Sequence, residues 1–238
     1  MKLNDGRSMP VVGLGTWKSK PGDVKQAVKA AVKCGYRHID CAYCYRNEAE
    51  VGEALQELFA EEVVTREELW ITSKLWNDFH AEEEVPAACA HTLRDLKLDY
   101  LDLYLVHWPV VTNFTGDVLN PPVEETWRAM EALRAAGKAR SIGVSNWSAK
   151  KLAAMRAHAR VFPAVNQVEL HPRLRQDDLL AACSELGTHL TACTAAAMTA
   201  LFQTRAPCPH RLSRIGRRLR RHARAWQTRR WARRTRRR

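Results

Sequence analysis

The chain alternates short apolar segments with longer segments in which apolar residues recur at helical spacing. Short apolar runs are typical of buried strands, and a recurrence every three to four residues is typical of amphipathic helices. The pattern predicts strands at residues 11–15, 38–40, 69–74, 100–107, 141–145, 164–169 and 189–192. It predicts helices between them at residues 21–34, 48–59, 82–96, 123–136, 148–158 and 176–186.

Single strands that alternate with single helices indicate parallel βα units. Six complete units and part of a seventh favour a (β/α)₈ TIM barrel, a fold that typically needs about 250 residues. A doubly wound sheet is the alternative, but its glycine fingerprint is incomplete because Lys18 stands where the third glycine belongs. We therefore expect an α/β barrel of about six to seven units over residues 1–192, incomplete at its C-terminal end.

Charge divides the chain unevenly. Of the 238 residues, 38 are Lys or Arg, and fifteen of these are arginines in residues 205–238, where there is no acidic residue. The rest of the chain has 23 basic residues against 26 acidic ones, so the net charge of +12 comes from the tail. A charge run of this kind predicts a disordered segment, and any binding of nucleic acid by it is expected to be non-specific, through phosphates.

The sequence shows no targeting or membrane segment. Residues 1–10 have no apolar signal region, and the longest apolar stretch, residues 192–202, is too short to span a bilayer. Seven scattered cysteines do not suggest a disulfide framework, so a reducing compartment such as the cytoplasm is expected. Cys41 and Cys44 have the spacing of a redox or zinc pair, but one pair is weak evidence and we expect no metal.

Four ionisable residues fall at the C-terminal ends of predicted strands, where barrels place their chemistry. They are Asp40, Tyr45, Lys74 and His107. Each alone has an ordinary structural interpretation, such as a helix cap or a surface charge. Together they form a plausible proton donor, because a lysine cation lowers the pKa of a nearby phenol and an aspartate holds the lysine. A histidine N–H can orient a carbonyl, and a hydride would have to come from a cofactor.

Several motifs extend this pattern over roughly residues 2–192. They are GYRHIDCA at residues 35–42, YRNE at 45–48, ITSKLW at 71–76, LYLVHWP at 103–109, IGVSN at 142–146 and NQVE at 166–169. In these motifs and their order the sequence resembles the aldo-keto reductase family. The resemblance implies a TIM barrel and the reduction of an aldehyde or ketone to the alcohol by hydride transfer from NADPH.

The resemblance also implies roles for individual residues. Tyr45 is the expected general acid, with Tyr43 as a less well-spaced rival, and Asp40, Lys74 and His107 complete the catalytic group. The expected cofactor-binding residues are Gly15, Thr16, Trp17, Asp40, Ser145, Asn146 and Gln167. The expected substrate-binding residues are Trp17, Trp76, His107 and Trp108, and for the three tryptophans core packing is the alternative.

The resemblance ends where residues 193–196 read CTAA. The family's later segments, which stack on the nicotinamide and grip the adenosine 2′-phosphate, have no counterpart in residues 193–238. This tail is either a shifted reading frame or a genuine variant end. The alternative hypothesis is thus a truncated, impaired family member whose tail binds polyanions. The particular carbonyl substrate is not indicated, and a monomer is expected.

Overall fold

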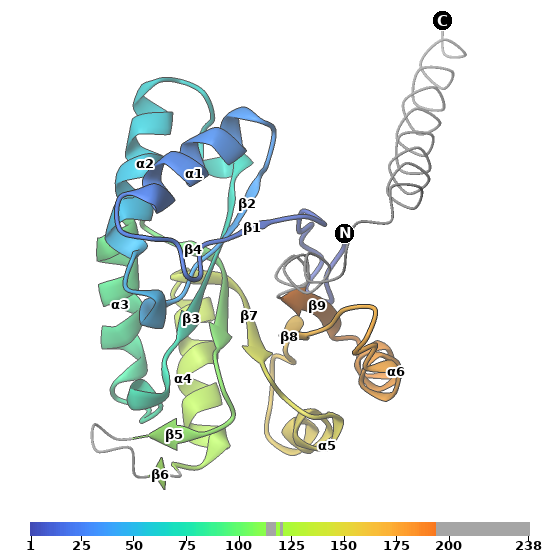
Figure 1. Cartoon of the computed structure of the whole chain (residues 1–238). Coiled ribbons are helices and arrows are strands. Elements are labelled where there is room, and N and C mark those ends of the chain that lie inside the picture. Colours follow the sequence, from blue (N-terminus) through green and yellow to red (C-terminus); the bar gives the residue numbers. More distant parts are fainter. Residues whose placement is uncertain (113–117, 120, 194–238) are drawn as a thin grey trace, which may run out of the picture. The chain divides into compact units, whose positions relative to one another are not determined.

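The computed structural model describes residues 1–112, 118–119 and 121–193, and all of them belong to one compact unit. Its centre is a parallel sheet of seven strands in the order β1-β2-β3-β4-β7-β8-β9 (Figure 1). The strands are β1 (Leu14–Gly15), β2 (His38–Asp40), β3 (Trp70–Leu75), β4 (Leu101–Val106), β7 (Ala139–Ser145), β8 (Val165–Glu169) and β9 (His189–Cys193). The predicted tail beyond residue 193 lies outside the described residues.

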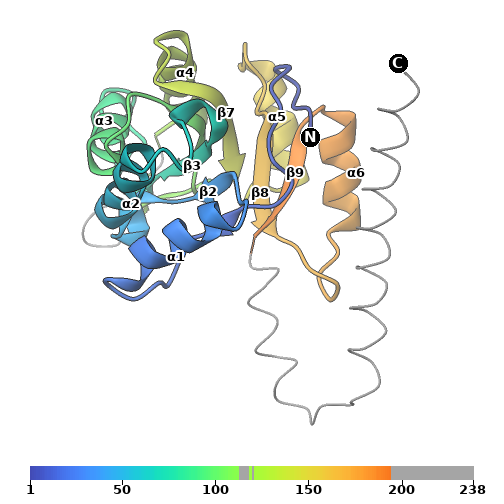
Figure 2. The same ribbon diagram turned by 90° about the horizontal axis from the view of Figure 1, so that it is seen from above.

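Helices connect the strands and lie outside the curved sheet (Figure 2). They are α1 (Asp23–Lys33), α2 (Glu48–Ala60), α3 (Val85–Leu96), α4 (Val123–Ala135), α5 (Ala149–Ala154) and α6 (Asp177–Glu185). Successive helices α1 to α4 pack against each other, as do α5 and α6. The (β/α)₈ fold class predicted from the pattern is therefore confirmed as a near-barrel of seven parallel strands.

Three predicted elements differ from the structure. The strand expected at residues 11–15 is reduced to β1, because Val11 and Val12 follow Pro10 and are 80% and 63% exposed. The helix expected from residue 82 begins at Val85, after a turn that contains the three glutamates at 82–84. The helix expected at residues 148–158 is the short α5 followed by a 3₁₀ turn, Met155–Ala157.

One pair of strands was not expected. Within the connection from β4 to α4, a two-stranded antiparallel hairpin pairs β5 (Val111–Thr112) with β6 (Val118–Leu119). Strands of two residues carry no recognisable period, so the apolar pattern gave no signal for them.

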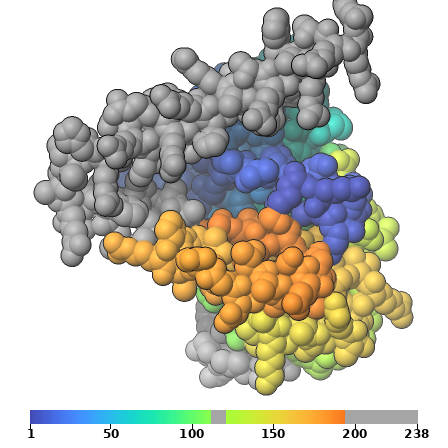
Figure 3. Space-filling view, turned by 90° about the vertical axis from the view of Figure 1, so that its right-hand side faces the viewer, coloured from blue at the N-terminus to red at the C-terminus, as the bar shows by residue number. Residues whose placement is uncertain are grey.

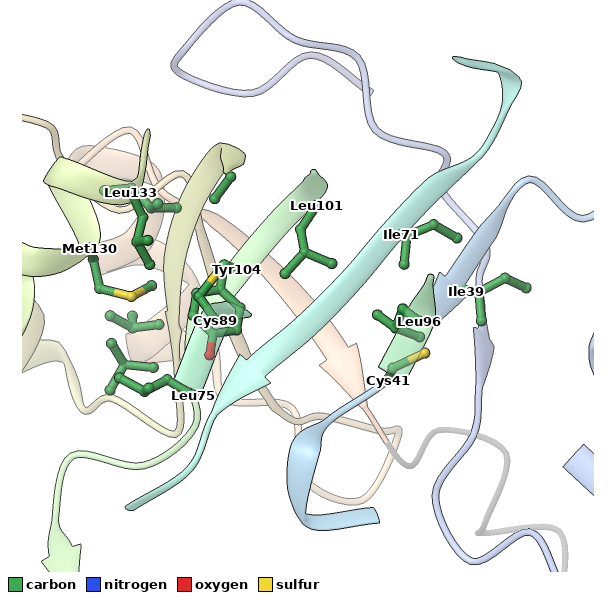
Figure 4. Packing of buried hydrophobic residues seen from close by; sticks show 14 of the residues in the cluster. Ile39, Cys41, Ile71, Leu75, Cys89, Leu96, Leu101, Tyr104, Met130 and Leu133 are labelled. Atoms are coloured by element: carbon green, nitrogen blue, oxygen red, sulfur yellow. The ribbon is translucent and has the colours of Figure 1, made fainter. Parts of the chain in front are cut away.

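The main hydrophobic core lies between the sheet and the helices, and it includes residues of α5 and α6 as well as of α1 to α4. Figure 4 shows Ile71 and Leu75 of β3 and Tyr104 of β4 facing side chains from α3 and α4, among them Cys89 and Met130. All six residues of β3 and all six of β4 are buried. These strands are covered on both faces, as central strands of a parallel barrel should be.

The N-terminal segment covers one end of the sheet. It turns at Asp5-Gly6, where Gly6 adopts a φ of 86°, which glycine tolerates best. The Asp5 carboxylate accepts a hydrogen bond from Ser141 Oγ at 2.5 Å, and Asn4 Nδ2 donates to the Pro163 carbonyl at 3.1 Å. In Figure 3 this segment, in blue, lies beside α6 and β9, in orange. It therefore ties the first residues to strands β7 to β9.

Opposite charges join the first two helices. Lysines of α1 face glutamates of α2 and the glutamate that caps it, Glu61. The contacts are Lys25–Glu53, Lys25–Glu57, Lys29–Glu57, Lys29–Glu61 and Lys33–Glu61. Both rows are spaced by four residues, so they run along one face of each helix. The row lies at the surface and aligns α1 with α2.

Candidate active site

A buried lysine organises the C-terminal end of the sheet. Lys74, on β3, is 1% exposed, and its Nζ donates to Asp40 Oδ1 at 2.5 Å, to the Cys41 carbonyl at 2.8 Å and to Tyr45 Oη at 3.2 Å. Burial opposes the charged ammonium, but Asp40 and Tyr45 outweigh burial and raise the Lys74 pKa. The cation thus has three oxygen partners, which is the full donor capacity of an ammonium.

Asp40 links two distant parts of the barrel. Its Oδ1 accepts from Lys74, and its Oδ2 accepts from Gln167 Nε2 on β8 at 2.7 Å. Three strands separate β2 from β8 in the sheet order, so this bond crosses the barrel interior rather than joining neighbours. The carboxylate is therefore fixed from both sides.

Tyr45 lies in the 3₁₀ turn Tyr43–Tyr45, between β2 and α2. Burial raises the pKa of its phenol, and the charge of Lys74 acts against that rise. The net direction differs from our expectation of a lowered pKa, because removing a phenolate from water costs more here than one cation returns. The phenol therefore holds its proton at neutral pH, as a proton donor must.

His107 follows β4 directly and completes the group. Its ring centre lies 6.0 Å from that of Tyr45 and 5.2 Å from that of Trp76. Burial, aided by the charge of Lys74, lowers the His107 pKa to about 3, so the ring is neutral. A neutral imidazole offers one N–H, enough to hold a carbonyl oxygen.

A second polar group lies at the ends of β7 and β8. Ser145 Oγ donates to the Gln167 carbonyl at 2.7 Å, and Asn146 Nδ2 donates to Ser145 Oγ at 3.1 Å and to the His107 carbonyl at 2.9 Å. Asn146 adopts a φ of 65°, a left-handed conformation that asparagine tolerates. The hydrogen bonds from Gln167 to Asp40 and from Asn146 to the His107 carbonyl join this group to the group around Lys74.

The first strand contributes a threonine to the same region. Gly15 ends β1, and the buried Thr16 donates from Oγ1 to the Asp40 carbonyl at 3.0 Å. Trp17 follows, 53% exposed, with its ring centre 6.5 Å from that of Tyr45.

The predicted tryptophans surround His107 and Tyr45. Trp76 contacts the His107 ring edge to face, and Trp108 stacks on it with ring centres 6.4 Å apart. Trp108 is 43% exposed, and Trp17 is more exposed still, so neither is a core residue. The structure thus places every predicted site residue at one end of the sheet.

Comparison with known proteins decides the family. The family model described as "Aldo/keto reductase family" matches residues 11–234, most of the chain. The chain belongs to the aldo/keto reductase family.

Curated relatives of this family are about half identical to the chain. "Aldo/keto reductase slr0942" of Synechocystis is 52% identical over 200 residues, which cover 80% of this chain and 61% of the relative. "Aldo-keto reductase family 1 member A1" of Homo sapiens is 48% identical over 202 residues, covering 80% and 62%. The chain thus spans about three fifths of the length of these aldo/keto reductases.

Solved aldo/keto reductases share the fold. A Bombyx mori aldo-keto reductase in complex with NADP superposes with a TM-score of 0.79 and 42% identity, covering 82% of this chain and 65% of that one. The aldose reductase from Schistosoma japonicum gives 0.78 and 46%, covering 81% and 67%. The shared barrel is the frame that positions the polar groups described above.

Sequence reasoning missed one buried carboxyl beside this candidate site. Glu48 begins α2 and is 3% exposed, and it accepts hydrogen bonds from Ser73 Oγ at 2.5 Å and Thr92 Oγ1 at 3.1 Å. Burial raises its pKa to about 7. Glu48 thereby ties the helix after Tyr45 to the strand that carries Lys74.

A neighbouring amide was missed as well. Asn47 is buried, and its Nδ2 donates to the Thr16 carbonyl at 2.9 Å. Both Asn47 and Glu48 lie in the YRNE motif, so the sequence placed them beside Tyr45 in the chain. Their partners come from other strands and helices, and the sequence gave no sign of these contacts.

The residues that the structure describes hold neither a candidate metal cluster nor a candidate membrane-spanning helix. Those residues contain no cluster of three or more His, Cys, Asp or Glu side chains suited to a metal ion. No described helix is both long enough and apolar enough to cross a membrane.

Proposed function

We propose that this chain reduces an aldehyde or ketone to the alcohol, with Tyr45 as general acid and NADPH as the source of hydride. One observation carries the proposal: Lys74 Nζ contacts Asp40 and Tyr45 together, deep in the end of the barrel. A phenol is a poor acid at neutral pH, so a fixed cation beside its oxygen is what lets it release a proton to a carbonyl.

The side chains divide the work in this proposal. Tyr45 donates the proton to the carbonyl oxygen, and Lys74 stabilises the phenolate that remains. Asp40 keeps the ammonium charged and in place. The neutral ring of His107 donates its N–H to the same carbonyl oxygen, and the exposed tryptophans Trp17 and Trp108 provide apolar contacts for the substrate.

The residues present fit a nicotinamide cofactor. Ser145 has a hydroxyl, and Asn146 and Gln167 have side-chain amides. Ser145 hydrogen-bonds with Asn146 and with the Gln167 carbonyl, and the Gln167 amide hydrogen-bonds with Asp40. Such a set of donors and acceptors is complementary to a carboxamide. Gly15 and Thr16 line the same end of β1. Hydride is what the cofactor supplies when bound. The NADP-complexed relative from Bombyx mori supports this assignment.

The test is a comparison of two tyrosines from the same turn. Tyr45→Phe should lower turnover of NADPH with 4-nitrobenzaldehyde by about 10²- to 10⁴-fold, the usual contribution of a general acid. NADPH binding, followed by nicotinamide fluorescence, should stay near that of the unmodified chain.

Tyr43→Phe is the matched control. The Tyr43 ring packs against Phe79 and His91, with centres 5.2 and 5.3 Å away. Tyr43→Phe keeps these ring contacts and should leave turnover within about twofold of that of the unmodified chain. Turnover retained by Tyr45→Phe would reject Tyr45 as the acid. An unmodified chain that neither binds NADPH nor reduces the aldehyde would reject the proposed function.

Three further properties remain part of the proposal. We expect a monomer, testable by light scattering, and a cytoplasmic location, based on the scattered cysteines. We also expect two parts, an aldo/keto reductase barrel at residues 1–192 and a non-homologous tail at residues 193–238. Limited proteolysis followed by mass spectrometry would locate that boundary.

A further inference from the structure

A cysteine contacts the ring of His107. Cys44 lies in the 3₁₀ turn Tyr43–Tyr45, and its Sγ is 3.7 Å from His107 Nδ1. Within the described residues, this thiol is the only hydrogen-bonding partner of the ring. The CxxC spacing alone assigned no role to Cys44, whereas this contact indicates one.

Both partners of this contact are neutral over the working pH range. Burial lowers the pKa of His107 to about 3, and burial raises the pKa of the Cys44 thiol to about 11. Between these limits the thiol keeps its proton and the imidazole carries one proton on one of its two nitrogens. The question is which nitrogen carries it.

Two arrangements of the protons are compatible with the distance. In one, the Cys44 S–H donates to Nδ1 and the ring proton is on Nε2. In the other, Nδ1–H donates to sulfur. The thiol is weak both as a donor and as an acceptor, but its sulfur already accepts from the Cys44 backbone N–H, so the first arrangement uses the group that remains free, the S–H. It leaves Nε2–H as the ring's free donor.

The choice of tautomer matters for carbonyl chemistry. A ring with the proton on Nε2 offers a donor to a substrate oxygen, whereas the other tautomer offers a lone pair that repels it. The rest of the surroundings do not settle the tautomer, because Trp76, Trp108 and Tyr45 meet the ring as aromatic faces and edges. Asn146 contacts only the backbone carbonyl of His107.

We propose that Cys44 is a positioning residue that holds His107 in the tautomer protonated on Nε2, so that this nitrogen donates to the substrate carbonyl. The proposal rests on the proposed reductase function for its consequence. The tautomer itself is a property of the protein without substrate, and it can be measured separately.

The first test reads the tautomer by NMR. Side-chain ¹⁵N shifts distinguish a protonated from an unprotonated ring nitrogen. In the full chain at neutral pH, with His107 assigned by comparison with His107→Gln, we expect a protonated Nε2 and an unprotonated Nδ1. Cys44→Ser keeps a donor of similar size and should keep these shifts. Cys44→Ala removes the donor, and its shifts should move toward an average of the two tautomers.

The second test measures the consequence for turnover. With NADPH and 4-nitrobenzaldehyde, Cys44→Ala should lower kcat by about 3- to 10-fold, the effect of one modest hydrogen bond, with little change in NADPH binding. Cys44→Ser should recover most of that loss. Cys34→Ala, at an exposed cysteine, is the control for loss of a thiol.

The outcomes separate the two proposals. A wild-type ring protonated on Nδ1, or shifts that Cys44→Ala leaves unchanged, would overturn the role of Cys44 whatever the activity. If Cys44→Ala does not fold, the wild-type shifts and Cys44→Ser still decide the question. The expected shifts in a chain without turnover would support the tautomer and reject the reductase function.

Discussion

The central strands of the barrel and its outer strands differ in how completely they are covered. Strands β3 and β4 are buried along their whole length, with neighbours on both sides. In the part of the chain that the structure describes, β1 and β9 each pair on one side only, and most of their residues are partly or fully exposed. Packing is therefore tightest in the middle of the sheet.

The chemistry follows the same division. Lys74 is on β3 and His107 follows β4, so two residues proposed to act on the proton and the carbonyl stand on or directly after the best-packed strands, whereas the donor Tyr45 lies in the turn after β2. Gln167, proposed to hold the cofactor, is on β8, next to the outer strand β9. We infer that the proton-donating group is more rigidly held than the cofactor-binding group.

Removal of the central cation should have the largest effect. Lys74→Met keeps the length of the side chain but leaves Tyr45 without the charge that favours its phenolate. Turnover with NADPH and an aldehyde should fall by about 10²- to 10⁴-fold. Lys20→Met, at an exposed position, should show no such loss. A Lys74→Met protein that is folded and fully active would contradict the central role of this strand.

Cavities of equal size test the difference in packing. Leu105 on β4 is fully buried, and Leu190 on β9 is 9% exposed. Leu105→Ala should lower the free energy of unfolding by about 2–5 kcal/mol. The loss for Leu190→Ala should be at or below the lower end of that range. Urea denaturation of both variants measures the two changes. An equal or larger loss for Leu190→Ala would show that β9 is as well supported as the centre.

Glu48 makes the central region sensitive to pH. Its pKa is raised by burial from 4.5 to about 7, so the folded state keeps a proton that the unfolded state releases. Its contribution to stability is full below pH 4.5 and is lost as the pH rises toward 7, by roughly 3 kcal/mol in total.

Glu48→Gln should remove this dependence. The difference in unfolding free energy between Glu48→Gln and the unmodified chain should grow in favour of the variant from about pH 5 to about pH 8. Glu83→Gln, at an exposed glutamate, should follow the unmodified profile. A difference that does not change with pH would mean that Glu48 titrates at an ordinary pKa.

The surface row between α1 and α2 should matter least. Lys29→Met removes the contacts to Glu57 and Glu61, but exposed ion pairs contribute little and are screened by salt. The melting temperature should fall slightly at low salt, and the difference should vanish at about 1 M salt. A loss of unfolding free energy as large as that expected for Leu105→Ala would show that helix alignment, rather than strand burial, dominates stability.

The sequence predicted the central part better than the edges for a physical reason. Continuous apolar runs located β3 and β4 to within a residue, because burial on both faces requires such runs. Val11 and Val12 have the same apolar character, yet they face solvent because the chain after Pro10 does not join the sheet. Apolar residues alone do not reveal whether a partner strand is available.

The candidate site shows the same limit. Strand ends and the family resemblance predicted Lys74 and His107, because parallel strands bring their ends together. The contacts of Glu48 with Ser73 and Thr92, and of Cys44 with His107, were not predicted. They depend on how α2 and its preceding turn pack on distant elements, which no local pattern encodes.

The two oxygens of Asp40 acquire their partners at different times during synthesis. Its Oδ1 contacts Lys74, 34 residues later in the chain, whereas its Oδ2 contacts Gln167, 127 residues later. Ribosomes add about 5–20 residues per second, so the second partner is made about 6–25 s after Asp40. Until then water must occupy that side of the carboxylate. The nascent barrel can form its aspartate–lysine pair early, but the carboxylate gains its second protein partner only when β8 docks.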